Sequence, residues 1–98
     1  MDRYSILYFL TGTRGGMNRI HILKLIQHSP LNAHQLKEKL NLDYKTIQHH
    51  LRLLSKHNFI RMGNETYGAT YHFTDLFKQY TSVFRKILAN LNKSSEAT

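Results

Sequence analysis

The side chains best suited to binding chemistry fall in one stretch, residues 43–57, where cationic and amide groups recur at helical spacing. Ile47, Leu51 and Leu54 lie at i, i+4 and i+7, so a helix here would bury them on one face. The opposite face would present ammonium, guanidinium, imidazole and amide groups, which bind phosphates and the edges of DNA bases. The residues that could make such contacts are Tyr44, Lys45, Thr46, Gln48, His49 and Arg52.

A shorter helix, expected over residues 33–40, comes before this helix in the chain and would hold it in place. Asn32 is a good N-cap, and Gln35 three residues later completes a capping-box pattern. A tight turn from Asn41 to Asp43 would follow, with the Asp43 carboxylate capping the next helix. Two helices joined in this way form a helix-turn-helix, whose second helix can enter the major groove of DNA.

The polar residues differ in what they could contact. Lys45 could be aimed at guanine O6 and N7, and Gln48 at adenine N6 and N7. Tyr44 and Thr46 could touch a thymine methyl group or a phosphate, and His49 could donate to a base or a phosphate. Phosphate contacts fix the register without reading sequence, and we expect them from Arg14, Arg19, Lys45, Arg52, Arg61 and Tyr67.

Length and composition limit the class of protein. The chain has 98 residues, enough for one domain with a modest core. Fourteen Lys and Arg against six Asp and Glu give a formal net charge of +8, which favours a polyanionic partner. The absence of cysteine excludes disulfides and thiolate metal sites. The apolar run 4–10 is too short to span a bilayer and lacks a signal-peptide cleavage site, so we expect a cytoplasmic protein with no membrane partner.

Seven histidines could bind zinc or titrate near neutral pH. No pair shows the i, i+4 or short-loop spacing of a ligand set, and the adjacent His49 and His50 would point about 100° apart on a helix. The six carboxylates are scattered, and no nucleophile, base and orienting group form a recognisable set. We therefore expect no cofactor, no metal and no enzymatic activity, while a histidine metal site shared across a dimer stays open.

The N-terminal part of the chain leads into the first core helix. Residues 2–10 are apolar on all sides of a helix, so the pattern does not decide between helix and strand. Three glycines within five residues then mark a turn. This turn is either a plain linker or a close approach that brings Arg14 and Arg19 to a DNA phosphate. The apolar face of residues 17–28 predicts the first core helix, which Pro30 would end.

A β-hairpin is expected after the second polar helix. Residues 59–62 and 70–73 have the composition of two short strands, with a glycine-bracketed loop between them. A hairpin in this place is the wing of a winged helix, and we place the wing at residues 61–72. Glu65 near its tip would repel phosphate, so the wing should contribute weakly to binding.

The C-terminal part should form one long helix that ends near Leu91, with Thr74 as its N-cap. Its apolar stripe is longer than one small core can cover. The surplus most simply packs against a second copy, since most soluble oligomers are two-fold homodimers, and packing wholly inside its own domain is the alternative. We therefore divide the chain into a winged-helix core at 12–74, a dimerisation helix at 75–92 and a flexible tail at 93–98. The expected interface residues are Tyr4, Leu7, Tyr8, Tyr80, Phe84, Ile87, Leu88 and Leu91.

The run from Leu42 to Leu54, followed by Asn58-Phe-Ile60 and the hairpin, resembles the winged-helix regulators of the ArsR type. In that family the recognition helix carries a Thr-Val/Ile pair and a His-Leu pair, found here as Thr46-Ile47 and His50-Leu51. Small archaeal members have a Thr-Arg-Gly-Gly-x-Asn-Arg segment similar to Thr13–Arg19. The resemblance covers about residues 12–74.

This resemblance implies a homodimeric transcription regulator bound to an operator with two half-sites, and a structural, half-buried role for His50. Members that sense metals use a pair of cysteines near the recognition helix, so that property is not carried over to this chain, which has none. The fold class we expect is mainly α with a small β-hairpin: a winged helix-turn-helix flanked by N- and C-terminal dimerisation elements.

The function we predict is sequence-specific binding of double-stranded DNA by a homodimeric transcription regulator. Its recognition helix, at about 43–57, would lie in the major groove and its wing, at 61–72, on the backbone. Two alternatives stay open, because winged helices also serve as protein-interaction modules and a basic surface can bind nucleic acid without reading sequence. A steep salt dependence with little sequence preference would favour non-specific binding, whereas binding that survives high salt would favour a protein partner.

Overall fold

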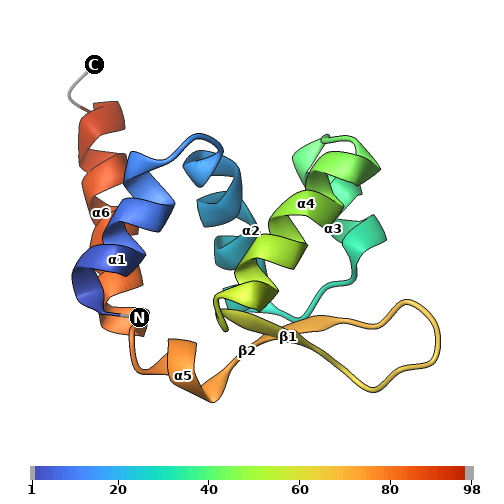
Figure 1. Cartoon of the computed structure of the whole chain (residues 1–98). Coiled ribbons are helices and arrows are strands. Elements are labelled where there is room, and N and C mark those ends of the chain that lie inside the picture. Colours follow the sequence, from blue (N-terminus) through green and yellow to red (C-terminus); the bar gives the residue numbers. More distant parts are fainter. Residues whose placement is uncertain (1, 97–98) are drawn as a thin grey trace.

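The computed structural model of the protein describes residues 2–96 and has the expected class, helical with one small antiparallel hairpin. Figure 1 shows α1 beside α6 at one end of the molecule and the hairpin extending from the other. Within residues 2–96, no helix combines the length and hydropathy that crossing a bilayer would require. The elements are α1 (Arg3–Leu7), the π-helical turn η1 (Tyr8–Gly12), α2 (Gly16–His28), α3 (Ala33–Leu40), α4 (Tyr44–Lys56), β1 (Ile60–Met62), β2 (Tyr71–Phe73), α5 (Asp75–Lys78) and α6 (Thr81–Glu96).

The two helices of the predicted helix-turn-helix, α3 and α4, begin at the caps that the sequence indicates. Asn32 Oδ1 accepts from the Gln35 amide at 2.8 Å, while Gln35 Oε1 accepts from the Asn32 amide at 2.9 Å. Asn41 ends α3 in the left-handed region, at φ 54°. Asp43 Oδ1 then accepts from the Thr46 amide at 2.8 Å and starts α4. The capping box and the turn are therefore confirmed.

The predicted hairpin is confirmed and is tied to the start of the helix-turn-helix. Strands β1 and β2 pair in antiparallel register, with Arg61 opposite His72. Asn58 turns the chain from α4 into β1 in the left-handed region, at φ 62°. The Tyr71 amide also donates to the Leu31 carbonyl at 2.9 Å, which adds an isolated bridge just before α3. The wing is thus anchored to the segment that enters the helix-turn-helix.

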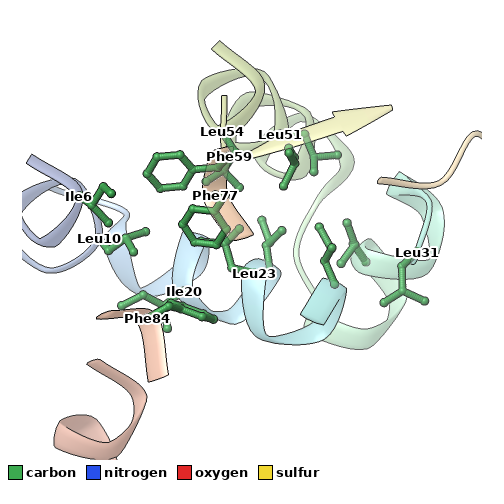
Figure 2. Packing of buried hydrophobic residues seen from close by; sticks show 14 of the residues in the cluster. Ile6, Leu10, Ile20, Leu23, Leu31, Leu51, Leu54, Phe59, Phe77 and Phe84 are labelled. Carbon is green, nitrogen blue, oxygen red and sulfur yellow. The ribbon is translucent and has the colours of Figure 1, made fainter. Parts of the chain in front are cut away.

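One hydrophobic core joins both ends of the chain to α2 (Figure 2). Phe77 is its aromatic centre: its ring stacks on Phe59 with centroids 4.7 Å apart and meets Phe73 edge-on at 4.9 Å. The buried hydrophobic residues are Ile6, Leu10, Ile20, Ile22, Leu23, Ile26, Leu31, Leu36, Ile47, Leu51, Leu54, Phe59, Ile60, Phe77, Phe84 and Ile87.

The undecided segment 2–10 is helical. Asp2 caps α1 by accepting from the Ser5 amide at 2.7 Å, and the chain then continues into the wider turn of η1. Ile6 and Leu10 are buried in the core, while the neighbouring tyrosines are exposed. The periodicity was ambiguous because η1 departs from the spacing of a regular α-helix.

The prediction of one continuous C-terminal helix is wrong, because the chain breaks between α5 and α6 at Gln79 and Tyr80. The break has a packing reason. Phe77 and Phe84 are both fully buried, with ring centroids 5.9 Å apart. Residues seven positions apart on a straight helix lie about 10 Å apart along the axis, so the break lets both rings enter one cluster.

Two further expectations for this part of the chain need correction. Phe84 and Ile87, predicted at a dimer interface, are 0% and 4% exposed because they pack in the chain's own core. The helix α6 also continues to Glu96, so residues 93–96 of the predicted flexible tail are helical, and residues 97–98 lie outside the described part.

We predict that Phe77→Ala lowers the free energy of unfolding by about 3–5 kcal/mol, the cost of removing a buried phenylalanine ring. The matched control is Leu76→Ala, since Leu76 is 39% exposed, and its effect should stay below about 1 kcal/mol. Urea unfolding followed by circular dichroism measures both. Equal losses from the two variants would contradict the aromatic centre assigned to Phe77.

Candidate nucleic-acid interface

The polar face of α4 is turned to solvent, as predicted. Ile47, Leu51 and Leu54 are 0%, 3% and 0% exposed, so these three side chains fix which side of the helix faces inward. No acidic residue occurs between Tyr44 and Lys56, which leaves the outward cations unopposed on their own helix. The exposed residues of this face are Tyr44, Lys45, Gln48, His49 and Arg52, while Thr46 is half-buried.

A hollow of about 440 Å³ lies between α4 and the hairpin. It brings together Gln48 and Arg52 of α4 with Arg61 of the wing, three residues that the sequence nominated separately. Met62 and Tyr71 also line it, and sequence reasoning missed both. Met62 is 57% exposed, and its place inside the predicted wing at 61–72 was the signal that the sequence offered for it.

The wing presents an exposed tyrosine, while its one acidic side chain is held by a hydrogen bond within the hairpin. Tyr67 in the loop is 91% exposed, while the Glu65 carboxylate accepts from the Thr70 hydroxyl at 2.8 Å. A backbone hydrogen bond from its own amide and this hydroxyl lower the pKa of Glu65, so the carboxylate is ionised at neutral pH. The negative charge that we expected near the tip is therefore present, and the hydrogen bond from Thr70 holds it within the hairpin.

Arg19 does not lie where the sequence analysis placed it. Its side chain is 2% exposed, and Nη2 donates to the carbonyl oxygens of Phe9 at 3.2 Å and Arg14 at 3.1 Å and to the Thr13 hydroxyl. The predicted phosphate contact by Arg19 is wrong, because a guanidinium enclosed in this way cannot reach DNA. Arg14 itself is exposed, so its predicted phosphate contact stays a prediction.

His50 is buried on the inner side of α4, which confirms its structural role. It is 5% exposed, and Arg19 Nη1 lies 3.4 Å from its Nδ1 atom. Burial lowers the pKa of His50 below its usual range, and the positive charges of Arg19 and His49 act in the same direction. His49 beside it is exposed. Among the described residues, no group of three His, Asp or Glu side chains could hold a metal ion.

The N- and C-terminal elements share an apolar surface away from the α4 face. Leu7 of α1 and Leu91 of α6 line a small hollow together with the buried Ile87 and the polar Thr11 and Asn90. Tyr4 and Tyr8 are 80% and 65% exposed on α1 and η1. We call Tyr4, Leu7, Tyr8 and Leu91 the apolar end surface. The half-buried Tyr80 and Leu88 pack against the core.

We predict that acidification destabilises the protein through His50. An unfolded imidazole takes up a proton near pH 6.5, roughly, whereas folded His50 does so only at lower pH. Between these two values the unfolded chain binds more protons, so the free energy of unfolding falls as pH drops from about 7 toward 5. His50→Asn should flatten this dependence in urea titrations. The control is His21→Asn, which replaces an exposed imidazole that is not among the groups acting on His50 and should keep the dependence; equal flattening by both variants would refute the assignment.

Solved structures with the same fold are transcriptional regulators. The transcriptional regulator BldR from Sulfolobus solfataricus is 15% identical, with a TM-score of 0.73 over 97% of this chain and 69% of that one. The HTH-type transcriptional regulator ytcD is 15% identical, with a TM-score of 0.75 over 98% of this chain and 99% of that one. An ArsR family regulator is 11% identical, with a TM-score of 0.57 over 98% and 93% of the two chains. At these identities the likeness shows the fold.

No curated protein matches the chain at a significant level. The family model described as winged helix-turn-helix matches residues 19–94, which run from the first turn of α2 through the hairpin to the last turn of α6. This range contains the capped α3–α4 pair, the wing and the exposed polar face. The chain belongs to the winged helix-turn-helix family.

Proposed function

We propose that the protein is a sequence-specific regulator of transcription that binds double-stranded DNA as a homodimer. The observation that carries the proposal is the exposed face of α4, where Lys45, Gln48 and Arg52 project from a helix whose other side is buried. Helix α3 holds α4 in place, which is the arrangement that a helix entering the major groove requires. Membership of the winged helix-turn-helix family favours binding over catalysis, and such a regulator would act in the cytoplasm.

The contacts divide into those that read bases and those that position the protein. We assign base reading to Gln48, whose amide can pair with adenine, and to Lys45, which can donate to guanine. Arg52 and Arg61 flank the hollow between α4 and the wing, and we assign both to phosphates. The remaining expected contacts are Arg14, Tyr44, Thr46, His49 and Tyr67.

The wing is a minor contributor in this proposal. Its exposed Tyr67 can reach the DNA backbone, but the ionised Glu65 lies in the same loop and repels phosphate. The main contribution of the hairpin to DNA binding would come from Arg61 at its base, next to α4, and not from the residues at its tip.

We assign the apolar end surface to a second copy of the chain. Tyr4, Leu7 and Tyr8 are exposed on the N-terminal elements, and Leu7 shares a hollow with Leu91 of α6. A two-fold dimer formed there would place its two α4 helices on successive major grooves if they lie about 34–36 Å apart. A symmetric operator would then follow from a symmetric protein.

The net charge of +8 favours a second candidate, binding of nucleic acid without sequence preference. Selection from random-sequence duplexes at two salt concentrations, together with the solution mass of the free protein, separates the candidates. Enrichment of a two-fold symmetric site by a dimer supports the regulator. Equal recovery of all duplexes with a steep salt dependence supports non-specific binding. Recovery of none would indicate that the exposed α4 face serves a protein partner.

We predict that Gln48→Ala relaxes discrimination at one base pair by about 1–3 kcal/mol, because the amide that distinguishes adenine is lost. Affinities for the selected duplex and for its single-base variants measure this. Preference at all other positions should remain. A uniform loss across every duplex would show that Gln48 contacts the backbone instead.

We predict that Arg52→Ala weakens binding to all duplexes alike and reduces the slope of log affinity against log salt by about one unit, because one phosphate contact is lost. Titrations at four salt concentrations give the slope. Lys24→Ala on the exposed side of α2 removes one charge away from α4 and is the control. A slope that is unchanged in Arg52→Ala, or reduced equally in the control, would contradict the assignment.

A further inference from the structure

Arg19 is a buried cation without a carboxylate partner. It is 2% exposed, and none of the ion pairs among the described residues includes it. Its Nε atom is buried without a hydrogen-bond partner, and burial lowers its pKa. A buried charge of this kind costs free energy unless its hydrogen bonds compensate. Stability alone is therefore a weak reason for an arginine at this position.

The groups that receive the hydrogen bonds of Nη2 come from one short segment, residues 9–14. Nη2 donates to the Phe9 carbonyl, the Thr13 hydroxyl and the Arg14 carbonyl. The Phe9 ring also lies under the guanidinium, with Cζ 4.3 Å from the ring centroid. Arg19 thus fixes the chain on both sides of Gly12, including the backbone of the exposed Arg14.

The same guanidinium reaches α4. Nη1 lies 3.4 Å from His50 Nδ1, which accepts because arginine can only donate. Gly15 packs so closely there that a Cβ atom would lie 2.9 Å from His50 Cε1. The Phe9 ring meets His57 at the end of α4, with centroids 4.6 Å apart. Segment 9–15 therefore contacts α4 at two positions about 10 Å apart along its axis.

Resting on the proposed function, we infer that Arg19 is a positioning residue for DNA recognition. Its hydrogen bonds hold segment 9–14 against His50 and thereby set the rotation of α4 about its own axis. The buried face of Ile47, Leu51 and Leu54 fixes which side of α4 faces inward, but apolar packing is not directional, so the exact angle of rotation is left to directed contacts such as these hydrogen bonds. This rotation sets the direction in which the His49 side chain points. It also sets the angle at which Gln48 would meet a base.

The test uses the full chain with Arg19→Met, which keeps an unbranched apolar stem and removes every donor. The probes are the duplex that the wild type selects from a random pool and a scrambled duplex of equal length. We expect the ratio of the two affinities to fall at least tenfold, while the slope of log affinity against log salt stays as in the wild type. The fold should persist, because the variant also removes the desolvation cost of an unpaired buried charge.

Two results would overturn the inference. A slope reduced by about one unit with an unchanged affinity ratio would limit the role of Arg19 to supporting a phosphate contact, such as that of Arg14. An unchanged affinity ratio in a folded Arg19→Met protein would make it irrelevant to recognition. Lys24→Met, on the exposed side of the same helix, is the matched control. It should leave both the affinity ratio and the slope as in the wild type.

If Arg19→Met does not fold, the pair His50→Asn and His50→Leu decides. An asparagine oxygen can accept in place of Nδ1, whereas leucine removes the acceptor and leaves the other bonds of Arg19 intact. The inference requires the affinity ratio to be retained by His50→Asn and lost by His50→Leu. Equal ratios in the two variants would refute it.

A readout without DNA separates this inference from the proposed function. If the wild type selects no duplex, the proposed function fails. Amide hydrogen exchange of the variants then still reports on the positioning. Arg19→Met should speed exchange in residues 10–16 and 48–51 while leaving α3 unchanged, and uniform exchange changes or none at all would refute the positioning role.

Discussion

The burial of one side of α4 is the constraint on which the rest of the structure depends. Ile47, Leu51 and Leu54 are almost fully enclosed, and a helix that buries these three residues has no freedom over which residues it exposes. Lys45, Gln48 and Arg52 are outward for this reason and need no partner of their own. The capped turn before α4 fixes where the helix starts. The hairpin after it contributes Ile60 to the core.

The acidic residues are used in ways that leave the basic surface exposed. Asp2 and Asp43 cap helices, where the helix dipole favours negative charge. Glu65 bonds within the wing, and Asp75 lies 3.7 Å from Lys78 at the start of α5. Backbone and hydroxyl hydrogen bonds lower the pKa values of Asp2, Asp43 and Glu65, so these groups stay ionised. None of these carboxylates opposes the cations in the middle of α4.

Local signals predicted the elements well, and contacts between distant residues were the ones that sequence could not supply. The cap at Asn32, the turn at Asn41 and the i, i+4 leucines are interactions within a few residues, so the sequence displays them directly. Arg19 meets His50 thirty-one positions away, and nothing in either neighbourhood signals that pairing. The break before α6 has the same origin, because the ring cluster around Phe77 is assembled from β2, α5 and α6.

The π-helical turn at Tyr8–Gly12 has a consequence for how the N-terminus tolerates insertions and deletions. Such a turn accommodates one residue more than an α-helical turn does, and an α-helix rotates by about 100° per residue. Loss of a single residue from this turn would let it close as an α-helical turn of nearly the same angle, so Ile6 would stay in the core and Tyr4 would keep its direction. Loss of a residue from α1 itself has no such compensation and would rotate the residues before it by about 100°. The π-helical turn therefore absorbs a one-residue deletion that a regular helix at this place could not.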